Sequence, residues 1–556
     1  MNVDRRNFIK GAFVAGAAMG SLGLAGCAPK GTAANDSSGE ALSSTDQPSF
    51  MVPPEPISDD EIAEVVETEV LVIGSGPAGF FAAQSAFEHG AAVHMVSSSE
   101  GPIAHGGDYW GFNTEAMRKN NVPFVDVDRL IEQRIRDNEY KVNQAKWRVL
   151  ARRNTEVMNW LVDKMEGAGY RTIILDGYDV PSTGQTLVAR GTHQWVAEGQ
   201  ALGTQGSAVL DVMSSTVAGN NVPIDYLHEA VMLVQDENSH RVTGAIAKTS
   251  EGVYKKYLAS KGVILATGDY TADQEMLQTY CADFADLGYG GMYSGGGHKM
   301  ALWAGAAWQR TIPGGAMAGS LCGGSAAFND CLGFCGLMVN ERGERYSNEA
   351  CATGYAAIAQ VRQPHKNAIA LWDSAYAEQA VGPWAESWQR PTADPSELPV
   401  AWAASVGEPV AIPGAPEQMC ISGDTIEELA QQLQEVYGTD PAALAETVSR
   451  YNELCAAGAD EDFGKPSEFM IPLEKGPFYA RYGGPSFLIA TGGLRTDTAM
   501  RVLDENDEPL PGLYAAGTIV GDMYANYDFA LGGIHLGGNC MTFGYIAGET
   551  VVADNA

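Results

Sequence analysis

The sequence predicts an α/β fold in which a parallel sheet with covering helices is interrupted by an inserted α+β domain. A strand, a tight glycine turn, a helix and a second strand follow one another between residues 69 and 97. Another buried strand ends in a glycine turn at 261–268, and the same pattern returns after residue 511. From 310 to 485, Gly/Ala-rich loops and a Pro/Trp-rich stretch break the pattern. Because 556 residues exceed one hydrophobic core, several domains are expected.

Charge and composition limit the classes of function. The chain has 69 acidic and 35 basic residues, a formal net charge of −34, which argues strongly against nucleic acid as a partner. An apolar fraction of 45% is typical of a globular protein. No repeat of solenoid period is visible.

The first 27 residues have the pattern of an export signal. Arg5 and Arg6 precede an uncharged segment, 11–24, that is too short to span a bilayer comfortably. Leu24–Cys27 resembles the lipobox of bacterial lipoproteins, and a chance cysteine behind an ordinary cleavage site is the alternative. We therefore expect twin-arginine export and a lipid anchor at Cys27 on the outer face of the cytoplasmic membrane. Residues 28–65, rich in Ser, Pro, Gly and acids, are expected to be a flexible tether.

The first strand ends at glycines spaced G-x-G-x-x-G, namely Gly74, Gly76 and Gly79, with a helical segment directly behind them. Such a turn lets a pyrophosphate approach the backbone at a helix start, which carries about half a positive charge. The motif lies between a strand and a helix in a unit of about 30 residues. It therefore predicts dinucleotide binding rather than an ordinary βα turn.

Hydrophobic periodicity predicts the elements that follow. Apolar residues recur at helical spacing from Val125 to Gly167. Alternating segments at 223–234 and 242–257 predict a β-meander. The segment 261–268 is expected to be another buried strand that ends in a tight glycine turn, and a final helix is expected over 542–552.

Seven motifs occur in the order found in the flavoprotein family of fumarate reductases, urocanate-type reductases and 3-ketosteroid dehydrogenases. They are Gly74–Gly79, Val263–Gly268, Gly295–Ala301, Val339–Glu349, Gly492–Asp497, Leu513–Gly517 and Gly537–Asn539. The chain resembles this family over nearly all of residues 66–556. The resemblance implies FAD as the cofactor, bound by a Rossmann-like domain with an inserted α+β capping domain. The expected division is a twin-arginine signal with lipobox (1–27), a tether (28–65), the FAD-binding domain in two parts (66–309 and 486–556) and a capping domain (310–485).

The resemblance also implies which residues contact FAD. Gly106 and Gly107 would face the isoalloxazine ring. The backbone of Cys540 and Met541, at the start of the last helix, would meet the pyrimidine edge of the flavin, where a helix N-terminus favours negative charge. Where an acid usually holds the adenine ribose, this chain has Ser97 and Ser98, with Glu100 just beyond. The expected contacts are Gly74, Gly76, Pro77, Ala78, Gly79, Ser97, Ser98, Gly106, Gly107, Asp108, Val231, Ala266, Thr267, Gly268, Gly517, Thr518, Asp522, Cys540 and Met541.

Fumarate reductases hold a dicarboxylate with two histidines and two arginines, and this chain departs from that pattern. Gln309–Pro313 contains no histidine, and Cys351–Gly354 contains no arginine. Leu488–Thr491 replaces the second histidine, and His535 replaces the last arginine. Losing several charge-assisted contacts of about 1.5–3 kcal/mol each would cripple the binding of a small dianion. Fumarate is therefore not the expected substrate.

The late region is similar to the ketosteroid dehydrogenases, in which tyrosines handle the proton and activate the carbonyl. Tyr527 occupies the segment in which that group carries a key tyrosine, and it is the first candidate for donating a hydrogen bond or proton to a substrate carbonyl. Tyr109 and His535 are the other catalytic candidates, with a packed tyrosine and a structural histidine as the alternatives. Arg345 and Arg495 are expected to hold loops.

We expect hydride transfer between flavin N5 and a carbon β to a carbonyl. The favoured function is an extracytoplasmic reductase of an activated C=C bond, an α,β-unsaturated carbonyl or carboxylate other than fumarate, used as in anaerobic respiration. Its electrons would come from a membrane quinol-linked or separate donor protein, because cytoplasmic nicotinamide is absent outside the membrane. A 3-ketosteroid-type dehydrogenase running oxidatively and a non-catalytic flavin electron-carrier lipoprotein are the alternatives.

Four cysteines lie close together in the expected capping domain. The spacings between Cys322, Cys331, Cys335 and Cys351 match no common iron–sulfur or zinc pattern. Free or disulfide-bonded thiols are therefore expected, and no metal site.

Overall fold

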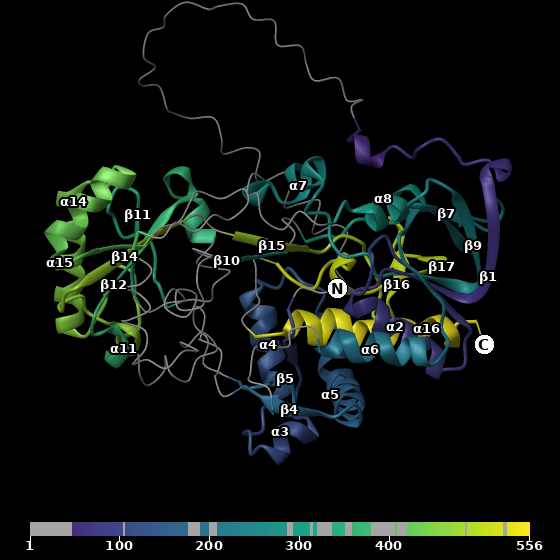
Figure 1. Cartoon of the computed structure of the whole chain (residues 1–556), viewed down its shortest axis with the longest axis horizontal. Helices are drawn as coiled ribbons and strands as arrows, with labels where there is room; N and C mark the ends of the chain where they lie inside the picture. Colours follow the sequence, from purple (N-terminus) through teal and green to yellow (C-terminus); the bar gives the residue numbers. More distant parts are fainter. Residues whose placement is uncertain are drawn as a thin grey trace, which may run out of the picture. The chain divides into compact units, whose positions relative to one another are not determined.

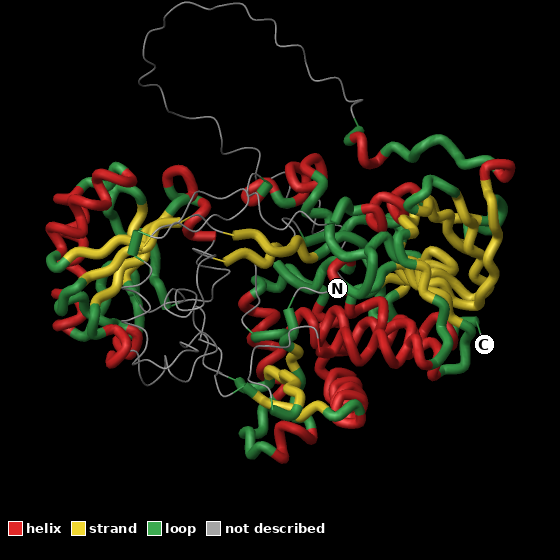
Figure 2. Tube along the Cα trace, viewed as in Figure 1, coloured by secondary structure: helices red, strands yellow, loops and turns green. Residues whose placement is uncertain are grey.

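The structure is a computed structural model. It describes residues 47–103, 106–175, 189–199, 208–285, 293–311, 315–319, 336–350, 358–379, 406–407, 420–483, 486–525 and 531–555. From Pro48 onward these residues belong to one compact unit. Its central feature is an eight-stranded mixed sheet (Figures 1 and 2).

Five parallel strands form the middle of this sheet, in the order β17-β9-β1-β2-β6. They are β1 (Ile62–Ile73), β2 (Val93–Val96), β6 (Ile224–Asp225), β9 (Tyr254–Leu265) and β17 (Pro509–Ala515). Three antiparallel strands complete the sheet, namely β16 (Arg501–Leu503) beside β17 and the pair β7 (His228–Gln235) and β8 (Val242–Thr249) beside β9. The carboxyl ends of the parallel strands share one edge, where ligands bind in open α/β sheets.

Three helices cover one face of the sheet: α2 (Pro77–Glu88), α6 (Ala208–Gly219) and α16 (Phe543–Ala553). Helices α2 and α16 lie side by side although they come from opposite ends of the chain (Figure 1). Glycine permits this approach, because a Cβ at Gly548 would lie 2.3 Å from the carbonyl oxygen of Ala82. The predicted fold class and the predicted first strand–turn–helix–strand unit are confirmed.

The β-meander is confirmed with one difference. β7, β8 and β9 are consecutive antiparallel strands, but β9 runs without interruption from Tyr254 to Leu265. The strand expected at 261–268 is therefore the second half of the last meander strand. A bulge between Thr68 and Val70 of β1 lets β9 pair along its whole length with that strand.

A helical layer follows the first unit, as the periodicity predicts. Asp126 and Asn143 cap the two main helices by accepting hydrogen bonds from the backbone N–H of Arg129 and Lys146. The elements of this layer are α3 (Glu115–Lys119), α4 (Val127–Asp137), α5 (Gln144–Gly167) and the strands β3 (Tyr109–Trp110), β4 (Tyr170–Ile174) and β5 (Thr192–Ala197).

A second, four-stranded antiparallel sheet lies within the region expected to form the inserted domain. Its order is β11-β12-β14-β13, and two helices pack on one face around a separate hydrophobic core. The elements are β11 (Leu337–Asn340), β12 (Ala368–Asp373), β13 (Cys420–Gly423), β14 (Phe478–Gly483), α14 (Ile426–Tyr437) and α15 (Pro441–Ala457). The strand pair β10 (Gly315–Gly319) and β15 (Ser486–Thr491) lies at its boundary with the main domain. The exact limits at 310 and 485 stay predictions.

Short elements connect these layers. They are η1 (Ser49–Met51), η2 (Asp59–Glu61), α7 (Gln274–Tyr280), η3 (Ala282–Phe284), α8 (Gly296–Trp303), η4 (Pro364–Lys366), α11 (Tyr376–Gln379), η5 (Ser467–Phe469), η6 (Gly517–Ile519) and the π-helix η7 (Leu536–Thr542). Within the described ranges, no helix is both long and apolar enough to cross a bilayer. The same ranges contain no group of His, Cys, Asp and Glu side chains arranged to hold a metal ion.

Candidate active site

The glycines after β1 have two different surroundings. A Cβ at Gly74 would lie 2.2 Å from the carbonyl oxygen of Ala266, and one at Gly79 would lie 2.0 Å from that of Gly74. Gly74 also has a φ of 120°, which other residues rarely adopt. By contrast, the nearest atom to a Cβ at Gly76 is the carbonyl oxygen of Ile103, 3.6 Å away. The first and third glycines therefore pack the turn, and the second keeps the start of α2 open.

The C-terminal segment completes this turn. Gly517 has a φ of 86°, and a Cβ there would lie 2.7 Å from the Cβ of Ala78 and 3.9 Å from the sulfur of Cys540. Burial raises the pKa of the Cys540 thiol to about 12, so the thiol stays protonated. The start of α2, the turn after β17 and the last helix thus meet at one place.

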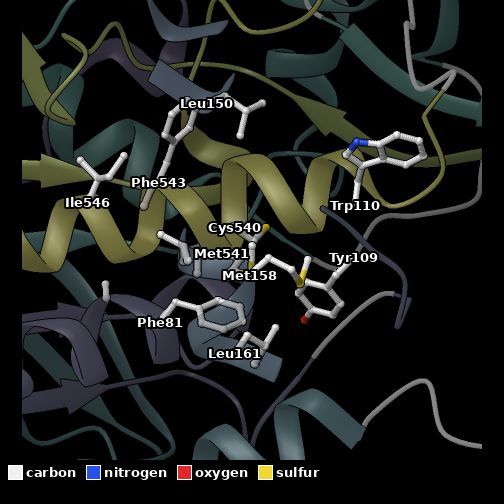
Figure 3. Packing of buried hydrophobic residues seen from close by; sticks show 14 of the residues in the cluster. Phe81, Tyr109, Trp110, Leu150, Met158, Leu161, Cys540, Met541, Phe543 and Ile546 are labelled. Atoms are coloured by element: carbon white, nitrogen blue, oxygen red, sulfur yellow. The ribbon is translucent and has the colours of Figure 1, made fainter. Parts of the chain in front are cut away.

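The last helix begins earlier than the sequence predicts. Residues 534 and 535 are already helical, and a π-helix over Leu536–Thr542 leads directly into α16. Cys540 and Met541 therefore lie inside a helix rather than at its N-terminus, and both are buried (Figure 3). The prediction that they begin a helix, and so present its N-terminal charge to the flavin, was wrong.

Close packing explains this early helix start. A Cβ at Gly537 would lie 2.1 Å from the carbonyl oxygen of Trp110, so only glycine lets the helix approach this strand. The carbonyl oxygen of Gly537 accepts hydrogen bonds from Thr542 Oγ1 at 2.6 Å and Asn154 Nδ2 at 3.1 Å. These contacts stabilise a glycine-rich run that helix propensity alone disfavours.

Other expected cofactor residues lie at or near the same edge. Ala266, Thr267 and Gly268 directly follow β9, and the ring of Tyr293 lies 3.1 Å from a Cβ placed at Gly268. Val231 is skipped in the β7–β8 ladder, where the register shifts between Ala230 and Met232. Such a bulge takes its backbone groups out of the regular pairing.

The loop with the glycine pair packs against the last helix. Gly106 has a φ of 83°, and its missing Cβ would lie 3.7 Å from Cδ1 of Leu536. Burial raises the pKa of Asp108, although a hydrogen bond from the Gln194 amide opposes that rise. Gly107 is partly buried beside them.

Asp522 has structural partners. Its Oδ1 accepts hydrogen bonds from the backbone N–H of Arg310 at 2.9 Å and of Thr311 at 3.0 Å, and from Thr311 Oγ1 at 3.0 Å. This arrangement fixes the chain that leaves the main domain near residue 311. The geometry favours a structural role for the Asp522 carboxylate over the predicted cofactor contact.

The three catalytic candidates have different positions. Tyr527 lies outside the described residues, as do Cys322, Cys331, Cys335 and Cys351. The Tyr109 side chain is 1% exposed and packs edge-on against Phe81, at a centroid distance of 6.0 Å (Figure 3). It also packs edge-on against Trp195, at 5.7 Å. Burial raises the pKa of Tyr109 well above its ordinary value, with further contributions from Cys540 and Asp108. This core position argues against Tyr109 as a proton donor.

His535 is a buried, neutral histidine. Its Nε2 lies 3.1 Å from Thr518 Oγ1, which joins two residues expected near the flavin. Burial lowers the pKa of His535 to about 4, so the imidazole is uncharged at neutral pH. It can then take part in a neutral hydrogen bond, but it does not supply the positive charge of an arginine.

The arginines expected to hold loops do so. Arg345 forms two-pronged ion pairs with Glu349 and Asp460, each with a closest approach of 2.8 Å. Although burial alone would raise the pKa of Asp460, hydrogen bonds from Arg345 and the local backbone lower it to about 2. Arg495 Nη1 lies 3.2 Å from Asp507 Oδ1.

Arg310 is likewise engaged away from the turn after β1. It is exposed and pairs with Asp507 at 2.6 Å. Gln309, in the first position of the expected clamp, accepts a hydrogen bond from the Gly493 N–H at 3.0 Å and is buried.

Sequence reasoning missed two groups at this edge. Ser75 and Ser99 form hydrogen bonds with Ser97, whereas Ser98 is exposed. The run of three serines directly after β2, residues 97–99, was the available signal. Asp269 is also buried, and its Oδ2 accepts a hydrogen bond from the Ala490 N–H at 3.0 Å.

A family model described as an FAD binding domain matches residues 69–536. The chain belongs to this FAD-binding family. It is an FAD-dependent oxidoreductase, similar to fumarate reductases and ketosteroid dehydrogenases, that acts on CH–CH or C=C bonds.

Three relatives illustrate the range of this family. The chain is 26% identical to a probable fumarate reductase, Ifc3, of Shewanella frigidimarina, over 87% of this chain and 74% of that protein. It is 24% identical to vinyl phenol reductase of Lactiplantibacillus plantarum, over 86% of this chain and 94% of that protein. The 3-ketosteroid-Δ4-(5α)-dehydrogenase of Rhodococcus jostii has the same fold, with a TM-score of 0.68, 23% identity and coverage of 89% and 99%.

The residues of this flavoprotein fit FAD. Among the described residues, Thr267 Oγ1 and Asn539 Nδ2 are buried polar atoms without a hydrogen-bond partner, and both lie in segments expected to contact the cofactor. Buried polar atoms normally have partners, so these two match a polar ligand. The open start of α2 at Gly76 offers backbone N–H groups suited to a pyrophosphate.

Proposed function

We propose that this protein reduces a C=C bond activated by a carbonyl, in an α,β-unsaturated carbonyl compound or a carboxylate other than fumarate. The observation that carries the proposal is the absence, among the described residues, of the charged clamp a small dicarboxylate needs. His535 is neutral, and Arg345 and Arg495 are committed to ion pairs within the fold.

A site without positive charges binds a dianion weakly. A charge-assisted hydrogen bond contributes about 1.5–3 kcal/mol, so replacing two or three of them by neutral groups removes most of the affinity for a dianion. A neutral site of this kind suits an uncharged or singly charged substrate. The relative named vinyl phenol reductase is likewise not named for a dicarboxylate.

FAD, when bound, would supply the hydride. Tyr527 would donate a hydrogen bond to the substrate carbonyl and stabilise the charge that develops on oxygen as the β-carbon accepts the hydride. A second donor would supply the proton that the α-carbon takes up, so that the C=C bond gains one hydride and one proton. His535 is held by Thr518 and stays uncharged, so it adds a neutral polar group beside this site. The buried thiol of Cys540 remains protonated.

We also propose that the protein works outside the cytoplasmic membrane. The twin-arginine sequence and the Leu24–Cys27 motif support export and lipid anchoring at Cys27. Outside the cytoplasmic membrane the reducing equivalents come from a quinol-linked or separate donor protein. Replacing Cys27 by Ser should move the protein from the membrane fraction to the soluble extracytoplasmic fraction, and unchanged fractionation would contradict the lipid anchor.

The fold similarity to a ketosteroid dehydrogenase supports one alternative, oxidation of a saturated ketone in the reverse direction. The direct test is anaerobic. The holoprotein is reduced with dithionite, and enones, cinnamates, steroids and fumarate are then added separately while flavin absorbance is followed. We expect an enone or cinnamate to reoxidise the flavin faster than fumarate. Fastest reoxidation by fumarate, or dehydrogenation of a saturated ketone without any reductase activity, would contradict the proposal.

Two tyrosine variants test the catalytic role of Tyr527. Tyr527→Phe should lower turnover about a hundredfold, the effect of removing a donor of oxyanion-hole type. Tyr109→Phe should leave turnover nearly unchanged, because this side chain packs in the core. Unchanged turnover of Tyr527→Phe would remove that residue from the site.

A further inference from the structure

The segment ahead of β1 is attached to the main domain at Phe50. Residues 28–65 are predicted to be a flexible tether, but this segment contains the short helix η1, in which Phe50 is 4% exposed. Ser49 N–H donates a hydrogen bond to Glu275 Oε1 at 2.8 Å, and the carbonyl oxygen of Phe50 accepts one from Trp303 Nε1 at 2.9 Å. Helices α7 and α8 of the main domain thus hold this segment.

Phe50 belongs to a hydrophobic cluster that two parts of the fold share. The main domain supplies residues of α7, η3 and α8, and the ring centroid of Tyr280 in α7 lies 5.7 Å from that of Phe50. The other part carries the sheet β11-β12-β14-β13, and we call it the capping region. It contributes Ile358 and Val361, which lie between β11 and β12, and the neighbouring strand β15 contributes Ala490. The cluster is therefore an interface between the main domain and the capping region.

Polar contacts at the same interface are exposed. Lys366 Nζ donates to the carbonyl oxygen of Asp283 at 3.0 Å, and Arg362 Nη2 lies 3.8 Å from the Asp283 carboxylate. Both side chains of the second pair are more than half exposed, so solvent screens their attraction. The burial of apolar surface is not weakened in this way. The cluster around Phe50 is thus the stronger of these contacts.

The chain that follows Phe50 makes this contact a separate attachment point. Residues 52–56 are exposed and include three prolines, which favour an extended, semi-rigid spacer. The spacer leads to β1, whose pairing with β9 begins at Ile62. The main sheet therefore forms without Phe50, and loss of the Phe50 ring should leave that sheet intact.

We propose that residues 48–51 act as a strap that holds the capping region against the main domain. Phe50 packs among residues of both parts, so its ring is a third component of their interface. Opening of the capping region would expose this cluster to water, and the buried ring opposes that opening. The chain before Pro48 includes Cys27, so a restraint on the N-terminal chain would act on this interface as well.

Hydrogen exchange of the full-length, FAD-loaded protein, followed by mass spectrometry, tests the strap. Phe50→Ala should speed exchange in residues 358–366 at least about tenfold, because this side of the interface opens more often. Peptides from β1 and β9 should exchange as in the wild type, because their pairing does not involve Phe50. Phe124→Ala is the matched control, since this phenylalanine is 85% exposed, and it should match the wild type throughout.

Trp303→Phe is the second variant. It removes the hydrogen bond to the Phe50 carbonyl oxygen and keeps an aromatic ring, so it should show the same pattern with a smaller increase even if Phe50→Ala does not fold. Faster exchange confined to residues 274–285 would show that Phe50 only completes the packing of the main domain, which would overturn the proposal. An equal increase in all peptides, or none in residues 358–366, would overturn it as well.

Discussion

Substitution by alanine should have opposite effects at two glycines in the first turn of α2, Gly76 and Gly79. Gly76 has φ and ψ of −81° and 178°, which alanine adopts freely, and a Cβ there has 3.6 Å of clearance from the protein. Gly79→Ala, by contrast, would place its Cβ 2.0 Å from a backbone carbonyl oxygen of Gly74. Gly76→Ala should therefore fold normally and lose FAD, whereas Gly79→Ala should lose stability.

The magnitudes follow from the contacts. A methyl group at Gly76 occupies the space through which a phosphate reaches the helix N–H groups. Loss of one charge-assisted hydrogen bond of about 1.5–3 kcal/mol weakens FAD binding about 10- to 140-fold. Overpacking at Gly79 should lower the free energy of unfolding of the flavin-free protein by about 1–3 kcal/mol.

Two measurements separate these effects. Flavin-free protein is unfolded with urea to obtain the free energy of unfolding, and FAD affinity is obtained from flavin fluorescence. Wild-type stability with weakened FAD binding is expected for Gly76→Ala. The reasoning is refuted if Gly76→Ala binds FAD as tightly as wild type, or if it destabilises the flavin-free protein as much as Gly79→Ala does.

Four further predictions concern buried titratable groups. Arg345→Met should lower the free energy of unfolding by about 3–5 kcal/mol in urea, because it removes the ion pairs that Arg345 forms with two buried carboxylates and leaves Lys465, 3.4 Å from Glu349, as the remaining cation of this group. A loss below about 1 kcal/mol would contradict this role. The pKa of Asp460 is about 2 in the fold, so its stabilising contribution is present above about pH 4 and should be lost as the pH falls toward 2. Acid unfolding of the wild type and of Asp460→Asn would measure this loss. Burial raises the pKa of Asp269 to about 6, although its hydrogen bonds act in the opposite direction. The contribution of Asp269 to the free energy of unfolding should therefore fall as the pH rises from about 4 to about 6. The Asp269→Asn variant should lack this pH dependence of stability. The His535 ring should show no titration between pH 5 and 8 by NMR, and a midpoint near 6.5 would refute its burial.

The sequence predicts the parts of this fold that rest on short-range patterns. The strand before Gly74 and the helix behind Gly79 follow from hydrophobic periodicity and from turn chemistry within a dozen residues. The early start of the last helix is different, because Gly537 is a poor helix former by itself. Its conformation is set by Trp110, more than 400 residues earlier in the chain.

In the candidate site, too, some features follow from short motifs and others depend on contacts between distant residues. The glycines, and the loop-holding roles of Arg345 and Arg495, could be read from motifs. Tyr109 could not, because a tyrosine beside glycines has the same sequence pattern whether its ring faces a ligand or the core. The hydrogen bonds of Ser75 with Ser97 and Ser99 join residues 22 to 24 positions apart, and sequence spacing alone does not reveal them.

The meeting of Ala78, Gly517 and Cys540 has a consequence for biosynthesis. Ser85 Oγ donates to the carbonyl oxygen of Tyr545, 460 residues later, so the nucleotide turn is completed only by the last part of the chain to leave the ribosome. At about 5–20 residues per second the ribosome needs roughly 20–90 s to make the intervening chain. Only the complete polypeptide then binds the flavin, and a truncated product remains colourless because it lacks the cofactor. A transport route that accepts only folded cargo would thereby select complete, cofactor-loaded molecules.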